Sequence, residues 1–147
     1  MKYLQAKQGR IFILRLEDGD IVHEEIEQFA RKQSIKAAAL IIIGSVDENS
    51  TLIVGPTQGK ARPVDPMEHI LDNAYEIAGV GTLFPDDQGD PMLHMHMACG
   101  RNKTTVTGCI RKGVKVWQIM EAILFELVDT NGIRAFDPAL GFKLLKI

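Results

Sequence analysis

The hydrophobic and polar positions of this chain mostly alternate as in β-strands, and one segment follows a helical period instead. Between residues 20 and 32 the apolar side chains recur every three to four positions, which predicts an amphipathic helix. Asp20 is its predicted N-cap, and acidic residues near its start with basic residues near its end suit the helix dipole. The apolar positions are Val22, Ile26, Phe29 and Ala30.

Runs rich in β-branched residues predict strands for most of the remaining chain. The run 37–43 contains three consecutive isoleucines and is predicted as a strand buried on both faces. The run 116–127 fits a helix nearly as well as a strand on periodicity alone. Residues 55–66 are predicted as a surface loop, and a last short strand follows a turn at 136–142. Further strands are predicted at 11–16, 52–54, 75–84, 92–99 and 104–110. The chain of 147 residues is therefore expected to form one α+β domain spanning residues 1–147.

Composition and charge narrow the class of protein. Hydrophobic residues make up 46% and charged residues 24% of the chain, as in ordinary globular domains. No apolar run approaches the roughly 18 residues that span a bilayer, and the first eight residues contain no apolar segment of a secretion signal, so a cytoplasmic protein is expected. The 17 basic and 19 acidic residues leave a net charge of −2, which disfavours binding to nucleic acid.

His94 and His96 are the first candidates for chemistry. They are separated by one residue in the predicted strand 92–99, so both side chains project from the same face. Neutral imidazole is a common ligand of zinc and other divalent metals. Two surface or hydrogen-bonded histidines produce the same spacing, so the pair alone leaves both interpretations open.

Cys109 joins the histidines through the hairpin predicted between the strands on either side of Gly100. A two-residue loop at 101–102 places Cys109 opposite His94, and a loop longer by two residues places it opposite His96. Cys109 shares the histidine face in either register, whereas the other cysteine, Cys99, has the opposite parity and points away. Two nitrogens and a thiolate leave a fourth position for water or a small-molecule ligand, which is typical of a catalytic or ligand-binding zinc site. The alternative for Cys109 is a small buried hydrophobic residue.

Glu121 and Arg15 are further candidates. Glu121 is a carboxylate inside an apolar run, where burial requires a partner. It is a candidate general base, a candidate supporting group for a metal site or one half of an interface ion pair. Arg15 is a candidate partner of Glu121 or an anion ligand. The sequence contains no P-loop, G-x-G-x-x-G or G-x-S-x-G motif, so nucleotide binding through those loops and a serine nucleophile of that type are excluded.

Residues 89–96 read Gly-Asp-Pro-Met-Leu-His-Met-His and resemble the G-x-P-x-x-H-x-H signature of the PPC domain, the plants and prokaryotes conserved domain. Glu121 matches a glutamate that the family has in a late strand, which favours a strand for 116–127. The resemblance covers nearly the whole chain. Its other matching segments are 15–20 (opening strand and helix start), 37–45 (central strand) and 137–141 (terminal segment).

The resemblance implies an α+β fold with a compact mixed or antiparallel β-sheet core and one main helix, assembled as a homotrimer. Prokaryotic members bind a metal with the two histidines and a third histidine in a Gly-Gly-His motif on the next strand. Thr107-Gly108-Cys109 stands at that motif here, so the implied ligands of a divalent ion, expected to be zinc, are His94, His96 and Cys109. A thiolate ligand makes zinc a weaker Lewis acid, which favours metal retention over fast hydrolysis.

Plant members of the family use a Gly-Arg-Phe-Glu-Ile-Leu stretch to contact partner proteins and carry AT-hooks that bind DNA. The strand that matches this stretch, 73–78, is similar only in its centre. The segment 59–63 lacks the Arg-Gly-Arg-Pro core of an AT-hook. The expected interface residues are Tyr75, Glu76 and Ile77 together with Arg15 and Glu121.

Three hypotheses about function follow from the sequence. The first is a trimeric metal-binding protein with an open position for a small ligand at the metal. The second is a zinc-dependent lyase or hydrolase acting on a small carboxylate, by analogy with the fold of acetolactate decarboxylase, which binds zinc through three histidines. The third is a DNA-associated regulator, which the net charge and the missing AT-hook disfavour.

Overall fold

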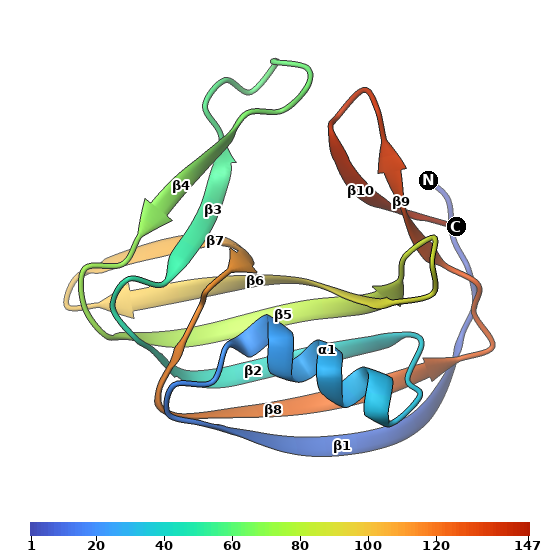
Figure 1. Cartoon of the computed structure of the whole chain (residues 1–147), viewed down its shortest axis with the longest axis horizontal. Helices are drawn as coiled ribbons and strands as arrows, with labels where there is room; N and C mark the ends of the chain where they lie inside the picture. The colour runs from blue at the N-terminus through green and yellow to red at the C-terminus, as the bar shows by residue number, and fades with distance from the viewer.

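The computed structural model describes residues 1–147 except for the side chain of Lys112. Within this described chain, eight strands form one antiparallel sheet in the order β1-β8-β2-β5-β6-β7-β3-β4, and β9 with β10 forms a separate hairpin (Figure 1). This arrangement confirms the predicted fold, a β-sheet core with one main helix. In chain order the elements are β1 (Lys7–Glu17), α1 (Val22–Lys32), β2 (Ala38–Val46), β3 (Thr51–Pro56), β4 (Pro66–Ile70), β5 (Tyr75–Pro85), β6 (Pro91–Arg101), β7 (Thr104–Lys112), β8 (Val116–Val128), β9 (Ile133–Asp137) and β10 (Phe142–Lys146).

The hydrophobic core lies between α1 and one face of the sheet. The helix buries Val22, Ile26 and Ala30, as its periodicity predicts. Side chains at alternate positions of the strands, such as Leu40 and Met95, meet these residues and are almost completely buried. We call this the inner face of the sheet. Gly79 and Gly81 of β5 lie on it, and a Cβ atom at Gly79 would come within 2.7 Å of the Ile42 side chain, so the absence of a side chain permits this packing.

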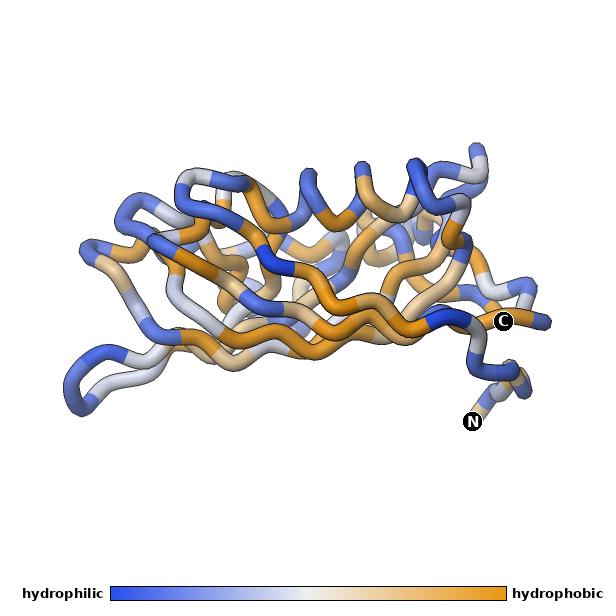
Figure 2. The backbone as a smooth tube through the Cα atoms, turned by 90° about the horizontal axis from the view of Figure 1, so that it is seen from below, coloured by the Kyte–Doolittle hydropathy of each residue, from blue (hydrophilic) through white to orange (hydrophobic). Residues whose placement is uncertain are grey.

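The opposite, outer face of the sheet carries a continuous row of paired residues. Each residue of this row lies directly opposite the next on the neighbouring strand. In Figure 2, α1 lies on one side of the sheet and hydrophobic stretches of the strands form the other side. From β1 to β3 the row consists of Ile13, Ile123, Ile41, Val80, His96, Cys109 and Ile53.

The outer face corrects the prediction that the strand of three isoleucines is buried on both sides. Leu40 and Ile42 are buried, but Ile41 is 48% and Ile43 is 59% exposed. Val80 of the neighbouring β5 is 63% exposed. The prediction was wrong because the hydrophobicity of a strand shows only that both of its faces are apolar. In the described chain the helix covers one face of the sheet, and the other face stays exposed.

The start of α1 also differs from the prediction. Ile21 occupies the N-cap position, and the helix has no side-chain cap there. The Asp20 carboxylate instead accepts a hydrogen bond of 2.8 Å from the backbone N–H of Glu17. Asp20 lies one residue before the N-cap, so its carboxylate closes the turn after β1 and does not reach the first helical amides.

The run 116–127 is a strand, as the family resemblance favours, and forms most of β8. Two short strands were not predicted. The segment 55–66 contains the end of β3 and the start of β4, and the C-terminal segment forms two strands rather than one. Both missed elements are short and lie at an edge of the fold, where sequence alternation over five residues is a weak signal.

Candidate metal centre

His94, His96 and Cys109 lie together on the outer face, where β6 pairs with β7. The Nε2 atoms of the two histidines are 3.2 Å apart. The ligand atoms of the three residues all lie within 4.8 Å of one another. Both imidazoles are exposed and Cys109 is buried, so the thiol forms the floor of the group and the rings form its open side.

The register of the β6–β7 hairpin sets this arrangement. His96 lies opposite Cys109, which is one of the two predicted registers. The loop itself differs from the two expected loops. Arg101 pairs with Thr104, so the two-residue loop is Asn102-Lys103. Asn102 has a φ of 54°, a left-handed conformation that asparagine adopts readily in such turns. The loop chemistry of Asn102 therefore places the thiol beside the histidines.

The second cysteine is in the core. Cys99 is fully buried on the inner face, and burial raises the pKa of its thiol to about 11. Its position confirms the expectation from strand parity that it points away from the histidines. Cys99 is therefore a packing residue, and Cys109 is the cysteine that faces the candidate metal centre.

The electrostatic surroundings keep His94 neutral. Partial desolvation of the ring, together with the positive charges of Arg134, His96 and Arg111, lowers the pKa of its imidazole to about 4. A neutral imidazole has a free lone pair for a metal ion, whereas a protonated ring does not. His94 is therefore in the ligand form at neutral pH.

The three side chains fit a zinc ion. Nitrogen ligands about 2.0–2.1 Å from a tetrahedral zinc are about 3.3 Å apart, and the two Nε2 atoms are separated by nearly that distance. Two imidazoles and one thiolate are donors that zinc accepts, and a fourth position stays available for water or a ligand. A hard cation such as Mg²⁺ prefers oxygen donors, which this group does not offer.

Two cavities adjoin the group. The larger has a volume of about 640 Å³ and extends from His94 and Cys109 toward α1 and the β9–β10 hairpin. It lies where β7 leaves β6, because their pairing ends at Met95 and Ile110. The smaller, about 360 Å³, lies on the side of β3 and β4 and is also lined by His94, His96 and Cys109. The candidate metal centre is therefore open to small molecules from both sides.

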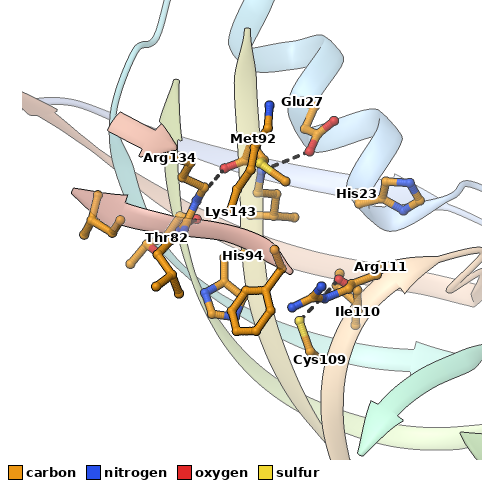
Figure 3. Close-up of a pocket in the computed structure, with 14 residues that line it drawn as sticks. His23, Glu27, Thr82, Met92, His94, Cys109, Ile110, Arg111, Arg134 and Lys143 are labelled. Carbon is orange, nitrogen blue, oxygen red and sulfur yellow. Dashed lines mark hydrogen bonds between the residues drawn. The ribbon is translucent and has the colours of Figure 1, made fainter. Parts of the chain in front are cut away.

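Two arginines line the larger cavity close to the candidate metal centre. Arg134 of β9 is only 4% exposed, and its guanidinium donates to Thr82 Oγ1 at 2.8 Å, with longer bonds of 3.3 Å to the carbonyl oxygens of Thr82 and Met92. Arg111 follows Cys109 by two residues and stacks over the Phe142 ring. In Figure 3 His94 lies between Arg134 on one side and Arg111 with Cys109 on the other.

Sequence reasoning did not select these arginines as site residues. Arg134 is separated from His94 by 40 positions and belongs to a hairpin that no motif connects to the histidines. Arg111 could have been selected from the sequence. It lies two residues after Cys109 in the predicted strand, so both side chains are expected on the same face.

Glu121 and Arg15 lie opposite each other on β8 and β1, as a partnership between them requires. The Arg15 side chain nevertheless bonds to Glu17, at 3.0 Å between Nε and Oε1. Three strand spacings separate Glu121 on β8 from the histidines on β6, and it lines neither of the two cavities described above. The structure therefore does not bring Glu121 to the metal centre.

The expected partner residues lie on β5. Ile77 is buried in the core, and Glu76 accepts a hydrogen bond of 3.0 Å from the Ser45 hydroxyl. The Tyr75 hydroxyl bonds to Asp72, and this bond raises the pKa of the phenol. All three side chains therefore make contacts within the chain, and Ile77 is the one that is buried.

The fold has close matches among solved structures. A metal-containing protein of Archaeoglobus fulgidus shares 24% identity with a TM-score of 0.85, and a plant- and prokaryote-conserved protein of Pyrococcus horikoshii shares 22% with a TM-score of 0.81; each match covers 100% of both chains. A candidate DNA-binding protein of Bacteroides thetaiotaomicron shares 16% with a TM-score of 0.77 over 96% of both chains. At these identities the likeness shows the fold alone.

Among curated proteins, the chain is similar to the bifunctional protein GlmU of two Synechococcus strains, at 28% identity over 141 residues and 30% over 140. These matches cover 94% of this chain, but the chain spans only about 20% of the length of either relative. Residues 3–128 match the profile of the Plants and Prokaryotes Conserved (PCC) domain. The described part of the chain contains no helix long and apolar enough to cross a membrane.

Proposed function

Because this chain belongs to the Plants and Prokaryotes Conserved domain family, we propose that it is a metal-binding member that holds a divalent ion, zinc, with His94, His96 and Cys109. One observation carries the proposal: three donor atoms of the types that zinc prefers lie within 4.8 Å of one another on one rigid hairpin. The metal-containing relative from Archaeoglobus supports it.

The ligand set favours binding over hydrolytic chemistry. A thiolate donates more charge to the ion than an imidazole does, so a bound water molecule stays less acidic than at a site with three histidines. When bound, the ion supplies a positive charge and an open coordination position. The residues of the chain hold it, keep His94 unprotonated and connect it to the two cavities.

Metal analysis of the purified protein tests this proposal. We expect about one zinc per chain after incubation with zinc and dialysis against a mild chelator, measured by mass spectrometry of the metal. His94→Ala and His96→Ala each remove one of three protein ligands, so both variants are expected to lose most of the metal. His69→Ala is the matched control, because this exposed histidine lies on β4 outside the group. Wild-type protein without zinc after this procedure contradicts the proposal.

A homotrimer completes the proposal. The family resemblance implies this assembly, and the outer face provides a surface that a second copy would bury. Ile13, Ile41 and Val80 lie in one cross-strand row and are all strongly exposed. Contiguous exposed apolar surface of this kind is typical of contact sites between proteins. The metal-binding residues His96 and Cys109 continue the same row, so the site lies next to the surface assigned to the contact.

A further inference from the structure

Arg134 is a buried positive charge without a negative partner in the part of the chain that the structure describes. Among the described residues its guanidinium donates hydrogen bonds only to a hydroxyl and two carbonyl oxygens, through Nε and Nη2, and it lies over the Phe84 ring. Nη1 has no hydrogen-bond acceptor among the described residues. An uncompensated buried charge is unfavourable, so a buried arginine normally meets a carboxylate or another anion.

The other charged residues of the larger cavity do not compensate Arg134. Lys143 pairs with Asp86 at 2.7 Å and with Asp87 at 3.2 Å, so its charge is balanced outside the cavity. Glu27 is engaged elsewhere, because Oε1 accepts a hydrogen bond of 2.9 Å from the N–H of Leu93 and Oε2 lies 4.0 Å from Nη2 of Arg31. Arg111 adds a second positive charge, and it stacks on an aromatic ring rather than pairing with a described carboxylate. The cavity therefore holds an excess of positive charge.

The excess charge lies directly beside the candidate metal centre. Arg134 and Arg111 line the same cavity as His94 and Cys109. Figure 3 shows the guanidinium groups of Arg134 and Arg111 on the two sides of His94. A ligand that pairs with either arginine in this cavity therefore lies next to His94 and Cys109 of the candidate metal centre.

We propose that the larger cavity is a binding site for a small organic acid, whose carboxylate pairs with Arg134 and Arg111. This inference rests on the proposed function, because it names the ligand class of the same site. A planar carboxylate matches the fork of a guanidinium and accepts two parallel hydrogen bonds from it. The volume of about 640 Å³ is in the range of small-molecule sites. The rest of the lining is largely apolar and includes Met92, Leu93, Leu144 and Leu145, so it suits a short hydrocarbon body.

Isovalerate and its amide test the inference, because they share one shape and differ in charge. Isothermal titration calorimetry is performed on metal-free and on zinc-loaded protein at constant ionic strength. We expect both forms to bind isovalerate in preference to isovaleramide, since the arginines belong to the chain and not to the metal. The titration of the metal-free protein tests the role of the arginines, because in the zinc-loaded protein the bound ion also attracts a carboxylate.

Two variants and one control variant test whether the preference for isovalerate over isovaleramide depends on the two arginines. Arg134→Met and Arg111→Gln should each weaken isovalerate binding roughly tenfold or more, the loss expected for one charge-assisted hydrogen bond. Lys36→Gln also removes one positive charge, but it lies on the exposed segment after α1 and should bind as the wild type does. If Arg134→Met does not fold, because its guanidinium also ties β9 to β5 and β6, the comparison of Arg111→Gln with Lys36→Gln decides.

The outcomes separate this inference from the proposed function. Equal binding of isovalerate and isovaleramide, or unchanged binding in Arg111→Gln, overturns the organic-acid site even if zinc is retained. A wild-type protein that holds no zinc but binds isovalerate through both arginines overturns the metal site and supports the organic-acid site. Zinc retention together with an arginine-dependent preference for the carboxylate supports both.

Discussion

His96 on β6 lies directly opposite Cys109 on β7, and this pairing places a thiol beside two imidazoles. The two strands are consecutive in the chain and are joined by the two-residue loop Asn102-Lys103, so the relationship depends on one turn. A shift of the register by one residue would turn Cys109 to the inner face and bring a neighbouring residue to the histidines. The composition of the candidate metal centre therefore depends on the register of this one hairpin.

The two cysteines should differ in their effect on metal content. Cys109→Ala removes one of three ligands and should lose most of the zinc, whereas Cys109→His should retain it because imidazole restores a ligand at an unchanged strand position. Cys99→Ala removes a thiol from the core and should lower stability but keep the zinc near the wild-type level. Zinc per chain is measured after dialysis against a mild chelator. Loss of zinc in Cys99→Ala instead would show that the register is shifted, for instance by a bulge.

The exposed row of the outer face should control the oligomeric state. Light scattering is expected to give a mass of three times 16.3 kDa. Ile41→Glu places a charge in the middle of this row and should shift the protein toward the monomer, because burying an unpaired carboxylate is costly. Ile133→Glu makes the same change on β9, outside the large sheet, and should leave the mass unchanged. A wild-type monomer over a wide concentration range would rule out the trimer.

Acid should weaken the ion pair between Glu126 and Arg10. Hydrogen bonds from Arg10, with Nε at 2.7 Å, lower the pKa of the Glu126 carboxyl to about 2 from its ordinary value of 4.5. The pair therefore stabilises the folded protein fully above about pH 4.5, and its contribution disappears as the pH falls toward 2. Glu126→Gln should cost roughly 1–2 kcal/mol at neutral pH, because the half-exposed arginine is partly screened by water.

Urea unfolding at pH 7 and at pH 3 measures this effect, and the difference between wild type and Glu126→Gln should shrink at the lower pH. Glu24→Gln, an exposed glutamate of α1, serves as the control. An equal difference at both pH values would show that packing rather than the carboxylate charge is responsible.

Binding to duplex DNA should be weak. With a net charge of −2 we expect dissociation constants no tighter than the non-specific range, roughly 10⁻⁴ to 10⁻⁶ M at physiological salt. Fluorescence anisotropy with unrelated duplexes, repeated at two salt concentrations, measures this. Nanomolar binding to any duplex at physiological salt would contradict the charge argument and support the hypothesis of a DNA-associated regulator.

The parts of the fold that depend on local pattern were predictable. The period of Val22, Ile26 and Ala30 located the helix, and strand parity placed His94 and His96 on the same face and Cys99 on the other. The loop of the hairpin was misplaced by one residue, because several positions near Gly100 suit a tight turn. The turn that forms uses the left-handed conformation of Asn102.

By itself, the sequence determined most of the elements and the candidate metal donors, because alternation and helical period are properties of neighbouring residues. Only the tertiary structure decided that Arg134 of the C-terminal hairpin lies beside His94, and that the isoleucines of β2 divide between a covered and an uncovered face. Both depend on which distant segments pack together. Hydrophobic burial is not directional, so a pattern shows that a surface must be covered and does not show which segment covers it.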